Sequence, residues 1–281
     1  MIREVDTDLI RRNLKEMCFT AAHTLSPDVL CALGAAAEEE TDPLGRQVLG
    51  TLMENLEIAK EETIPICQDT GMAVVFLEIG QDVHLTGKDL TQSVNEGVAE
   101  GYTEGYLRKS VVGDPLIRKN TGNNAPAVLH TSIVPGDKVK ITLAPKGFGS
   151  ENKSRLFMLT PADGVQGVKD AVMETVRAAG PNACPPFSIG VGVGGTFEYC
   201  ALMAKKALIR PAGSRSPLPH IAELERELLE EINATGIGPA GLGGKCTALS
   251  VAVETYPTHI AGLPVAVNIC CHVNRHCARE I

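Results

Sequence analysis

The sequence changes character over residues 64–71, and this change constrains the fold more than any other feature. A region with helical periodicity ends there, and the apolar run Met72–Gly80 begins. A nearly continuous apolar run closed by glycine predicts a buried strand. A junction between a helix and a strand can aim several side chains into one cleft. This junction carries Cys67, Gln68 and Asp69, so we take it as the starting point for a functional site.

The rest of the chain alternates between helical and strand patterns. The first sixty residues are predicted to be helical, with N-caps at Ser26 and Asp42, each followed by proline. Apolar residues recur every fourth position from Leu44 to Leu56, which predicts the apolar stripe of a helix. Further helices are predicted at about 90–107, 165–179, 196–208 and 220–233, and strands at about 127–134, 138–143, 187–193, 248–253 and 264–269.

This mixture predicts an α/β fold of the mixed α+β kind, with a helical N-terminal segment and mixed sheets. Length allows one large domain, and we expect a single domain over residues 1–281. Residues 211–219 are the one stretch typical of a linker.

Composition excludes several classes of function. The chain carries 26 Lys and Arg against 34 Asp and Glu, and no basic stripe with interleaved aromatic residues, so we expect no nucleic-acid partner. No window approaches about 20 uninterrupted apolar residues, so we expect no membrane span. Nine cysteines without regular spacing, and acidic residues where a signal peptide would be apolar or basic, predict a reducing, cytoplasmic location.

Three glycine-rich segments leave two interpretations open. Residues 145–154, 190–195 and 236–245 could each cradle an anion or bring the backbone close to a ligand, or each could be a structural turn or mobile loop. Residues 145–154 lack the G-x-x-x-x-G-K-[ST] spacing of a P-loop. The acidic runs Glu38–Glu40 and Glu61–Glu62 are interpreted as solvated helix faces.

Six motifs stand out along the chain, namely Cys67–Gly71, Leu107–Ser110, Lys146–Asn152, Gly241–Gly244, Thr258–Pro264 and Cys271–His276. They occur in the order seen in iron–sulfur hydro-lyases. The chain resembles the alpha subunit of two-subunit class I fumarases and L(+)-tartrate dehydratases, and the resemblance covers nearly its whole length.

The resemblance implies that Cys67, Cys184 and Cys271 hold a [4Fe-4S] cluster. Three thiolates leave one iron without a protein ligand, so that this iron can act as a Lewis acid, whereas a fourth cysteine would suit electron transfer. Cys246 and Cys270 remain alternatives for one of the three ligands. The Cys- and His-rich end of the chain could instead bind zinc locally or be a frayed tail, although it has no C-x-x-C pair.

The resemblance also implies a dicarboxylate site. It places Gln68 and Asp69 in the cleft, with Arg108, Gly149 and His259 contacting the substrate. These residue types suit the task, because arginine can bind a carboxylate through two hydrogen bonds and histidine can donate or transfer a proton. Asp69 is the candidate acid–base residue, and the alternative is that it only caps the turn that follows it.

The implied reaction is the reversible addition of water next to a carboxylate. Members of the family also use residues from a second region that this sequence does not contain, so we expect a beta subunit to complete the site, with alpha–alpha contacts in a heterotetramer. We favour fumarate as the substrate and keep L(+)-tartrate as the alternative. A non-catalytic iron–sulfur electron carrier or regulatory subunit is the remaining class.

Overall fold

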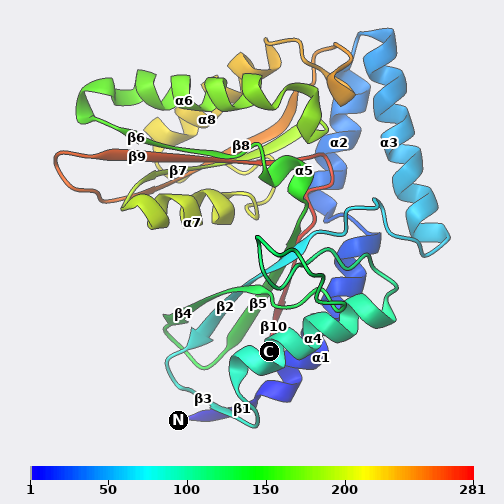
Figure 1. Cartoon of the computed structure of the whole chain (residues 1–281). Helices are drawn as coiled ribbons and strands as arrows, with labels where there is room; N and C mark the ends of the chain where they lie inside the picture. Colours follow the sequence, from blue (N-terminus) through cyan, green and yellow to red (C-terminus); the bar gives the residue numbers. More distant parts are fainter. Residues whose placement is uncertain (1) are drawn as a thin grey trace. The chain divides into compact units, whose positions relative to one another are not determined.

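Figure 1 shows the computed structural model of the protein, which describes residues 2–281. The chain divides into two compact units. Unit 1 contains residues 2–26, 56–147 and 275–281, and unit 2 contains residues 27–55 and 148–274. Helices and strands occur in both units, which confirms the predicted mixed α/β class.

The division does not fall at the predicted linker. Residues 211–219 lie within unit 2, where the N–H of Ala212 donates to Asp28 at 2.7 Å and the N–H of Ser216 donates to Glu225 at 2.9 Å. The segment contains no helix or strand until its last residue, but these bonds fasten it to two helices. Its proline and glycine content therefore marks a tethered loop.

Unit 1 is built on a four-stranded mixed sheet with the order β10-β5-β2-β4. β2 pairs parallel to β4 and antiparallel to β5, and β10 pairs antiparallel to β5. A separate parallel pair joins β1 and β3. The elements are β1 (Arg3–Asp6), α1 (Thr7–His23), β2 (Met72–Gly80), β3 (Val83–Thr86), α4 (Leu90–Glu104), β4 (Val128–Val134), β5 (Val139–Lys146) and β10 (Cys277–Glu280).

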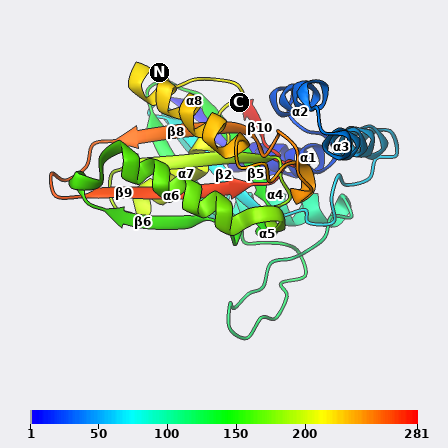
Figure 2. The ribbon, with the colours of Figure 1, turned by 90° about the horizontal axis from the view of Figure 1, so that it is seen from above.

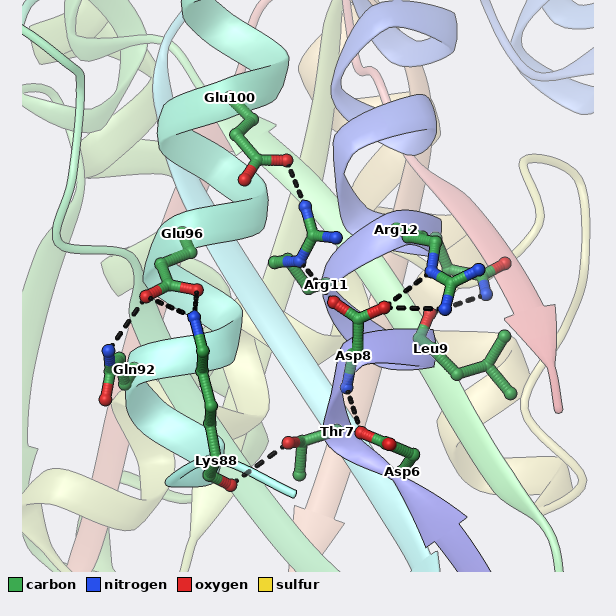
Figure 3. Close-up of polar contacts among 11 residues, drawn as sticks. Asp6, Thr7, Asp8, Leu9, Arg11, Arg12, Lys88, Gln92, Glu96 and Glu100 are labelled. Atoms are coloured by element: carbon green, nitrogen blue, oxygen red, sulfur yellow. Dashed lines mark hydrogen bonds and ion pairs between the residues drawn. The ribbon is translucent and has the colours of Figure 1, made fainter. Parts of the chain in front are cut away.

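Helices α1 and α4 pack against each other and bury their apolar faces with β2 and β5 in one core. On the polar side, Arg11 of α1 forms an ion pair with Glu100 of α4 (Figure 3). Asp6 caps α1 by accepting the N–H of Asp8 at 2.9 Å, and Asp89 caps α4. The core fixes both ends of β2, and the residues that precede β2 include Cys67.

Unit 2 is built on a second four-stranded mixed sheet with the order β6-β9-β7-β8. β7 pairs parallel to β8 and antiparallel to β9, which pairs antiparallel to β6. The helix α3 (Pro43–Glu61) begins in unit 2 and continues past residue 55 into unit 1. The other elements are α2 (Pro27–Glu39), α5 (Phe148–Glu151), β6 (Arg155–Leu159), α6 (Gly164–Ala179), β7 (Phe187–Gly194), α7 (Phe197–Ala207), α8 (Pro219–Asn233), β8 (Ala248–Tyr256) and β9 (Leu263–Cys270), with short 3-10 turns η1 (Pro161–Asp163), η2 (Gly180–Ala183) and η3 (Pro239–Gly241).

This sheet is covered on both faces. Helices α6 and α8 pack on one face and α7 on the other (Figure 1). Gly192 of β7 lies directly against α7, where a Cβ atom would sit 2.1 Å from the carbonyl oxygen of Cys200. The glycine-rich segment 190–195 is therefore largely strand, and its glycines let a helix approach the sheet closely.

The structure corrects two details of the predicted helices and ends. Asp42 accepts the N–H groups of Leu44 and Gly45 and caps α3 as predicted, but the hydroxyl of Ser26 has no hydrogen-bond partner within residues 2–281. The C-terminal residues are not a frayed tail, because β10 pairs with β5 from Cys277 onwards. Within residues 2–281, no helix is both long and apolar enough to cross a membrane.

A long loop joins α4 to β4 in unit 1 (Figure 2). Its tip is ordered by its own hydrogen bonds, since Asp114 accepts the N–H groups of Leu116 and Ile117 at 2.8 and 2.7 Å. Both of these apolar side chains are exposed. The base of the loop carries Arg108, one of the predicted substrate contacts.

Candidate active site

Residues 67–71 form a tight loop before β2, which we call the cysteine loop. The N–H of Asp69 donates to the Cys67 sulfur at 3.4 Å, and the N–H of Gly71 donates to Asp69 Oδ1 at 3.1 Å. Gly71 has φ of +78°, and a Cβ atom there would lie 2.9 Å from the backbone of Lys146. Only glycine combines this conformation with this close approach, so the loop has one available path.

Three successive carbonyl groups of the cysteine loop accept hydrogen bonds from buried side chains. A guanidinium N–H of Arg275 donates to the carbonyl oxygen of Asp69. The hydroxyl of Tyr102 lies 2.7 Å from the carbonyl oxygen of Thr70 and 3.2 Å from that of Gly71. Burial raises the pKa of Tyr102, so its hydroxyl remains a donor. These contacts fix the backbone that carries the Asp69 carboxylate.

A second set of contacts holds the base of the α4–β4 loop beside the cysteine loop. Thr70 Oγ1 donates to the carbonyl oxygen of Arg108 at 2.8 Å. The buried Asn124 donates to Gly71 O at 3.1 Å and accepts the backbone N–H groups of Ser110 and Val111. Unit 1 therefore brings together four of the predicted site residues, namely Cys67, Gln68, Asp69 and Arg108.

Unit 2 brings together two of the predicted cysteines. Cys184 follows η2 with a left-handed φ of 53°, and its carbonyl oxygen accepts the N–H of His272 at 3.3 Å. His272 Nδ1 also lies 3.1 Å from this oxygen. Because β7 and β9 are antiparallel, with Ser188 opposite Cys270, the start of β7 and the end of β9 meet at the same end of the sheet. Cys184 and Cys271 lie at this end of the sheet.

Gly149 lies near the same end of the unit 2 sheet, in the single turn of α5. Helix α5 contacts η2, which precedes Cys184. Its last residue, Glu151, forms an ion pair with Lys205 of α7 at 2.5 Å and accepts a hydrogen bond from Asn268 of β9 at 3.0 Å. This network fixes α5 against the sheet, and Gly149 itself has open space around its Cα.

His259 lies elsewhere in unit 2. It belongs to the exposed loop between β8 and β9, before the first residue of β9, whereas Cys271 follows the last residue. A strand of this length spans roughly 23 Å, since each residue advances about 3.3 Å. Unit 2 therefore does not bring His259 to the cysteines. Its ring nitrogen accepts the N–H of Ala261 at 3.2 Å within its own loop.

The donor types fit an iron–sulfur group. Thiolates are the usual cluster ligands, and a backbone N–H already points at the Cys67 sulfur, as is common around cluster sulfurs. Within residues 2–281, no group of three or more His, Cys, Asp or Glu side chains is gathered as a metal site. Cys184 and Cys271 lie at one end of the sheet of unit 2, and Cys67 lies in the cysteine loop of unit 1.

The two alternative ligands are less suited to the role. Burial raises the pKa of the Cys246 thiol to about 12, with Glu40 and Glu39 adding to the effect, and a protonated thiol is a poor metal ligand. Cys270 is a buried residue of β9, whereas Cys184 is exposed and Cys271, just after the strand, is partly exposed. This contrast favours Cys184 and Cys271 over Cys246 and Cys270.

Glu40 corrects the expectation of a solvated acidic run. Its side chain is only 1% exposed, and its carboxylate accepts the N–H of Lys245 at 2.8 Å and that of Cys246 at 3.1 Å. It also accepts the N–H groups of Thr41 and Asp42, just before α3. Burial alone would raise the pKa of Glu40, but four backbone donors outweigh burial and lower it. Glu40 is thus the anchor of the glycine-rich segment 236–245.

This segment in turn supports Cys184. Gly241 packs directly on Pro181, and the N–H of Ala240 donates to the carbonyl oxygen of Pro185 at 2.9 Å. Pro181 and Pro185 flank Cys184 in the sequence. The glycine-rich segment 236–245 therefore supports the end of the unit 2 sheet at which Cys184 lies, and the buried carboxylate of Glu40, just after α2, holds this segment in place.

Replacing Glu40 with Ala is expected to lower the free energy of unfolding by about 3 kcal/mol at neutral pH, because buried N–H donors lose a charged acceptor. Glu39→Ala is the matched control on the adjacent, exposed position, and it should change this free energy by less than about 0.5 kcal/mol. Urea unfolding followed by circular dichroism measures both. Equal, small changes in the free energy of unfolding for both variants would show that the hydrogen bonds of the Glu40 carboxylate do not stabilise the fold.

The same carboxylate predicts a pH dependence. Because the folded-state pKa of Glu40 is lowered, its stabilisation is fully present above the unfolded-state pKa of about 4.3. It is lost as the pH falls through the lower folded-state pKa. The difference between the wild type and Glu40→Ala should therefore shrink as the pH of the urea experiment is lowered below about 4.

Comparisons with known proteins show the family of the chain. The family described as fumarate hydratase (Fumerase) matches residues 11–280. A protein of Methanocaldococcus jannaschii, named provisionally as an L(+)-tartrate dehydratase subunit alpha, is 41% identical over 272 residues, covering 95% of each chain. The L(+)-tartrate dehydratase subunit alpha of Escherichia coli K12 is 34% identical over 251 residues, covering 88% of this chain and 82% of that protein. The chain therefore belongs to the class I fumarate hydratase family of hydro-lyases.

Proposed function

We propose that this chain is the alpha subunit of an L(+)-tartrate dehydratase that depends on a [4Fe-4S] cluster. The observation that carries the proposal is the cysteine loop, which presents a thiol, an amide and a carboxylate on a rigid backbone beside Arg108. The substrate is inferred from the names of relatives at 34% and 41% identity. These relatives favour the tartrate alternative over our initial preference for fumarate.

In this proposal Cys67, Cys184 and Cys271 would hold the cluster. When bound, it would supply Lewis-acid chemistry toward a substrate hydroxyl through an iron without a protein ligand. Removing a proton next to a carboxylate builds negative charge on the substrate, and side chains of the protein must stabilise this charge. Arg108 supplies a positive charge for a substrate carboxylate, and its backbone is held beside the cysteine loop.

Asp69 and Gln68 are the remaining polar groups on the cysteine loop. Asp69 is the proposed acid–base residue, and a Cβ atom at Gly147 would lie 3.1 Å from its carboxylate, so this glycine leaves room for it. Gln68 can orient the substrate by donating and accepting hydrogen bonds. Gly149 is proposed to offer its backbone N–H, whereas the position of His259 argues against a role beside the cysteines of its own chain.

Fumarate hydration is the second candidate function. It is favoured by the family description, which names fumarate hydratase. Fumarate and the dehydrated form of tartrate differ by one hydroxyl on a four-carbon dicarboxylate skeleton, so the same cation and carboxylate could serve both. The contribution of this chain to either reaction is the same.

A second chain is part of the proposal, because the relatives are named as alpha subunits. We expect dehydration of L(+)-tartrate only when this chain is produced anaerobically together with its beta partner. Each chain alone should give less than about one per cent of the activity of the mixture, since a site that lacks acid–base groups loses roughly a hundredfold or more. Full activity of this chain alone would contradict the need for a partner.

A further inference from the structure

We infer that Arg275 is a positioning residue that aims Asp69 at the substrate from beneath the cysteine loop. The inference rests on the proposed function for the role of Asp69, but its structural part can be tested separately. It is carried by three observations: the burial of the guanidinium, the single carbonyl group that it holds, and the nitrogens that it leaves unpaired.

Arg275 is only 3% exposed. One terminal nitrogen donates to the carbonyl oxygen of Asp69, while Nε and the other terminal nitrogen are buried and have no hydrogen-bond partner within residues 2–281. The position of Arg275 is set by its own element, because it precedes β10, and Cys277 pairs with Leu143 of β5. A fixed strand thus delivers a buried cation to the cysteine loop.

The contact acts on Asp69 directly. The carbonyl carbon that Arg275 holds is bonded to the Cα atom that carries the carboxylate, and a planar peptide moves as one body. Tyr102 holds the next two carbonyl groups in the same way. Without Arg275, the carbonyl group of Asp69 loses the donor that orients it, and a displacement of about 1 Å at a reacting group can cost a hundredfold in rate.

A purely structural role does not explain this arrangement. A buried cation with unpaired nitrogens is costly to the folded state, and replacing such a group with an apolar side chain of similar volume is often neutral or stabilising. Residues that cost stability are typical of functional sites. The guanidinium is therefore best explained by what it does for the cysteine loop.

The variants Arg275→Met and Arg275→Lys separate the two roles. Methionine fills a similar volume without a donor, and lysine keeps the charge and one donor but loses the fork geometry. Arg279→Met is the matched control, because Arg279 lies four residues further along, on β10, but pairs at the surface with Glu16 at 2.6 Å. Neither control nor variant removes a predicted ligand of the cluster.

Amide hydrogen exchange of the full chain tests whether Arg275 holds the cysteine loop, and it does not require an active enzyme. In Arg275→Met, the amides of the cysteine loop should exchange about tenfold faster or more, since a hydrogen bond to a charged group is lost. The rest of unit 1 should be unchanged, Arg275→Lys should be intermediate, and Arg279→Met should match the wild type. Unchanged exchange in the cysteine loop, or faster exchange throughout unit 1, would overturn the inference.

Steady-state kinetics of this chain in complex with its partner test whether Arg275 positions Asp69 for turnover. Arg275→Met should lower kcat by about tenfold to a hundredfold and change KM by less than about threefold, because Asp69 is misaimed while Arg108 still binds the carboxylate. A rise in KM with unchanged kcat would overturn the positioning role. If the wild-type complex dehydrates no dicarboxylate, the proposed function fails, and the exchange experiment still decides whether Arg275 holds the loop.

Discussion

Replacing Cys67, Cys184 or Cys271 singly with Ser is expected to abolish turnover and the retention of iron. A serine hydroxyl is a much weaker iron ligand than a thiolate, and a cluster held by three residues has none to spare. Iron and sulfide analysis of anaerobically purified protein, together with its visible absorbance, measures the loss. Full iron content after loss of any one of the three would contradict the ligand assignment.

Two controls sharpen this result. Cys31→Ser changes an exposed cysteine on α2 and should leave iron content and turnover unchanged. Cys246→Ser tests the alternative ligand and should also retain iron, because the raised pKa of Cys246 disfavours a thiolate. We avoid Cys18 as a control because it is fully buried in the core of unit 1, where a hydroxyl is itself destabilising.

Asp69→Asn is expected to lower turnover by roughly a hundredfold or more with iron content unchanged. The structure makes this substitution clean, because Asp69 Oδ1 accepts the N–H of Gly71 at 3.1 Å and the amide oxygen of Asn can do the same. The shape of the turn is kept, and only the ability to take up a proton is lost. Steady-state kinetics with the partner present and the absorbance of the cluster measure the two quantities.

The alternative role of Asp69 gives the opposite result. If the carboxylate only caps the turn, Asn caps about as well and turnover stays near the wild-type value. Proton transfer would then belong to the partner chain. Gln68→Glu at the neighbouring exposed position is a useful comparison, because it adds a carboxylate to the same loop without changing the turn.

Most of the long helices and strands could be predicted from the sequence because each carries its own periodicity or apolar run. The strand Met72–Gly80 and the helix ends near Glu61 and Asn233 are examples. The strands β1, β3, β6 and β10 were not predicted, since each has only four or five residues and exists because a distant strand pairs with it. The two-unit division could not be predicted either, because it is drawn by contacts between segments far apart in the sequence.

The candidate site divides in the same way. Cys67, Gln68 and Asp69 are adjacent in the sequence, so their meeting in one loop needed no knowledge of the fold. The residues that support them were not predicted. Tyr102 is 32 residues from Thr70, whose carbonyl group it binds, and Arg275 is 206 residues from Asp69, whose carbonyl group it binds. No local pattern distinguishes a buried tyrosine that holds a loop from one that fills a core.

Glu40 shows the limit of reading charge from composition. It follows two other glutamates and belongs, by pattern, to a solvated helix face. It is buried because α2 ends just before it, and the chain turns so that its carboxylate meets Lys245 and Cys246 from a segment about 200 residues later. A carboxylate at a helix end next to a turn is the only local signal that could have suggested this.

The most direct test is the ratio of kcat/KM for L(+)-tartrate to that for malate and fumarate, measured on the anaerobically prepared complex of this chain with its partner. A site that hydrogen-bonds the second hydroxyl of tartrate should reject a substrate that lacks it, since its own polar groups would be left unpaired. We therefore expect L(+)-tartrate to be preferred by at least about a hundredfold. A complex that hydrates fumarate faster than it dehydrates tartrate would contradict the proposed substrate, and a complex that acts on none of the three would contradict the assignment as a dicarboxylate hydro-lyase.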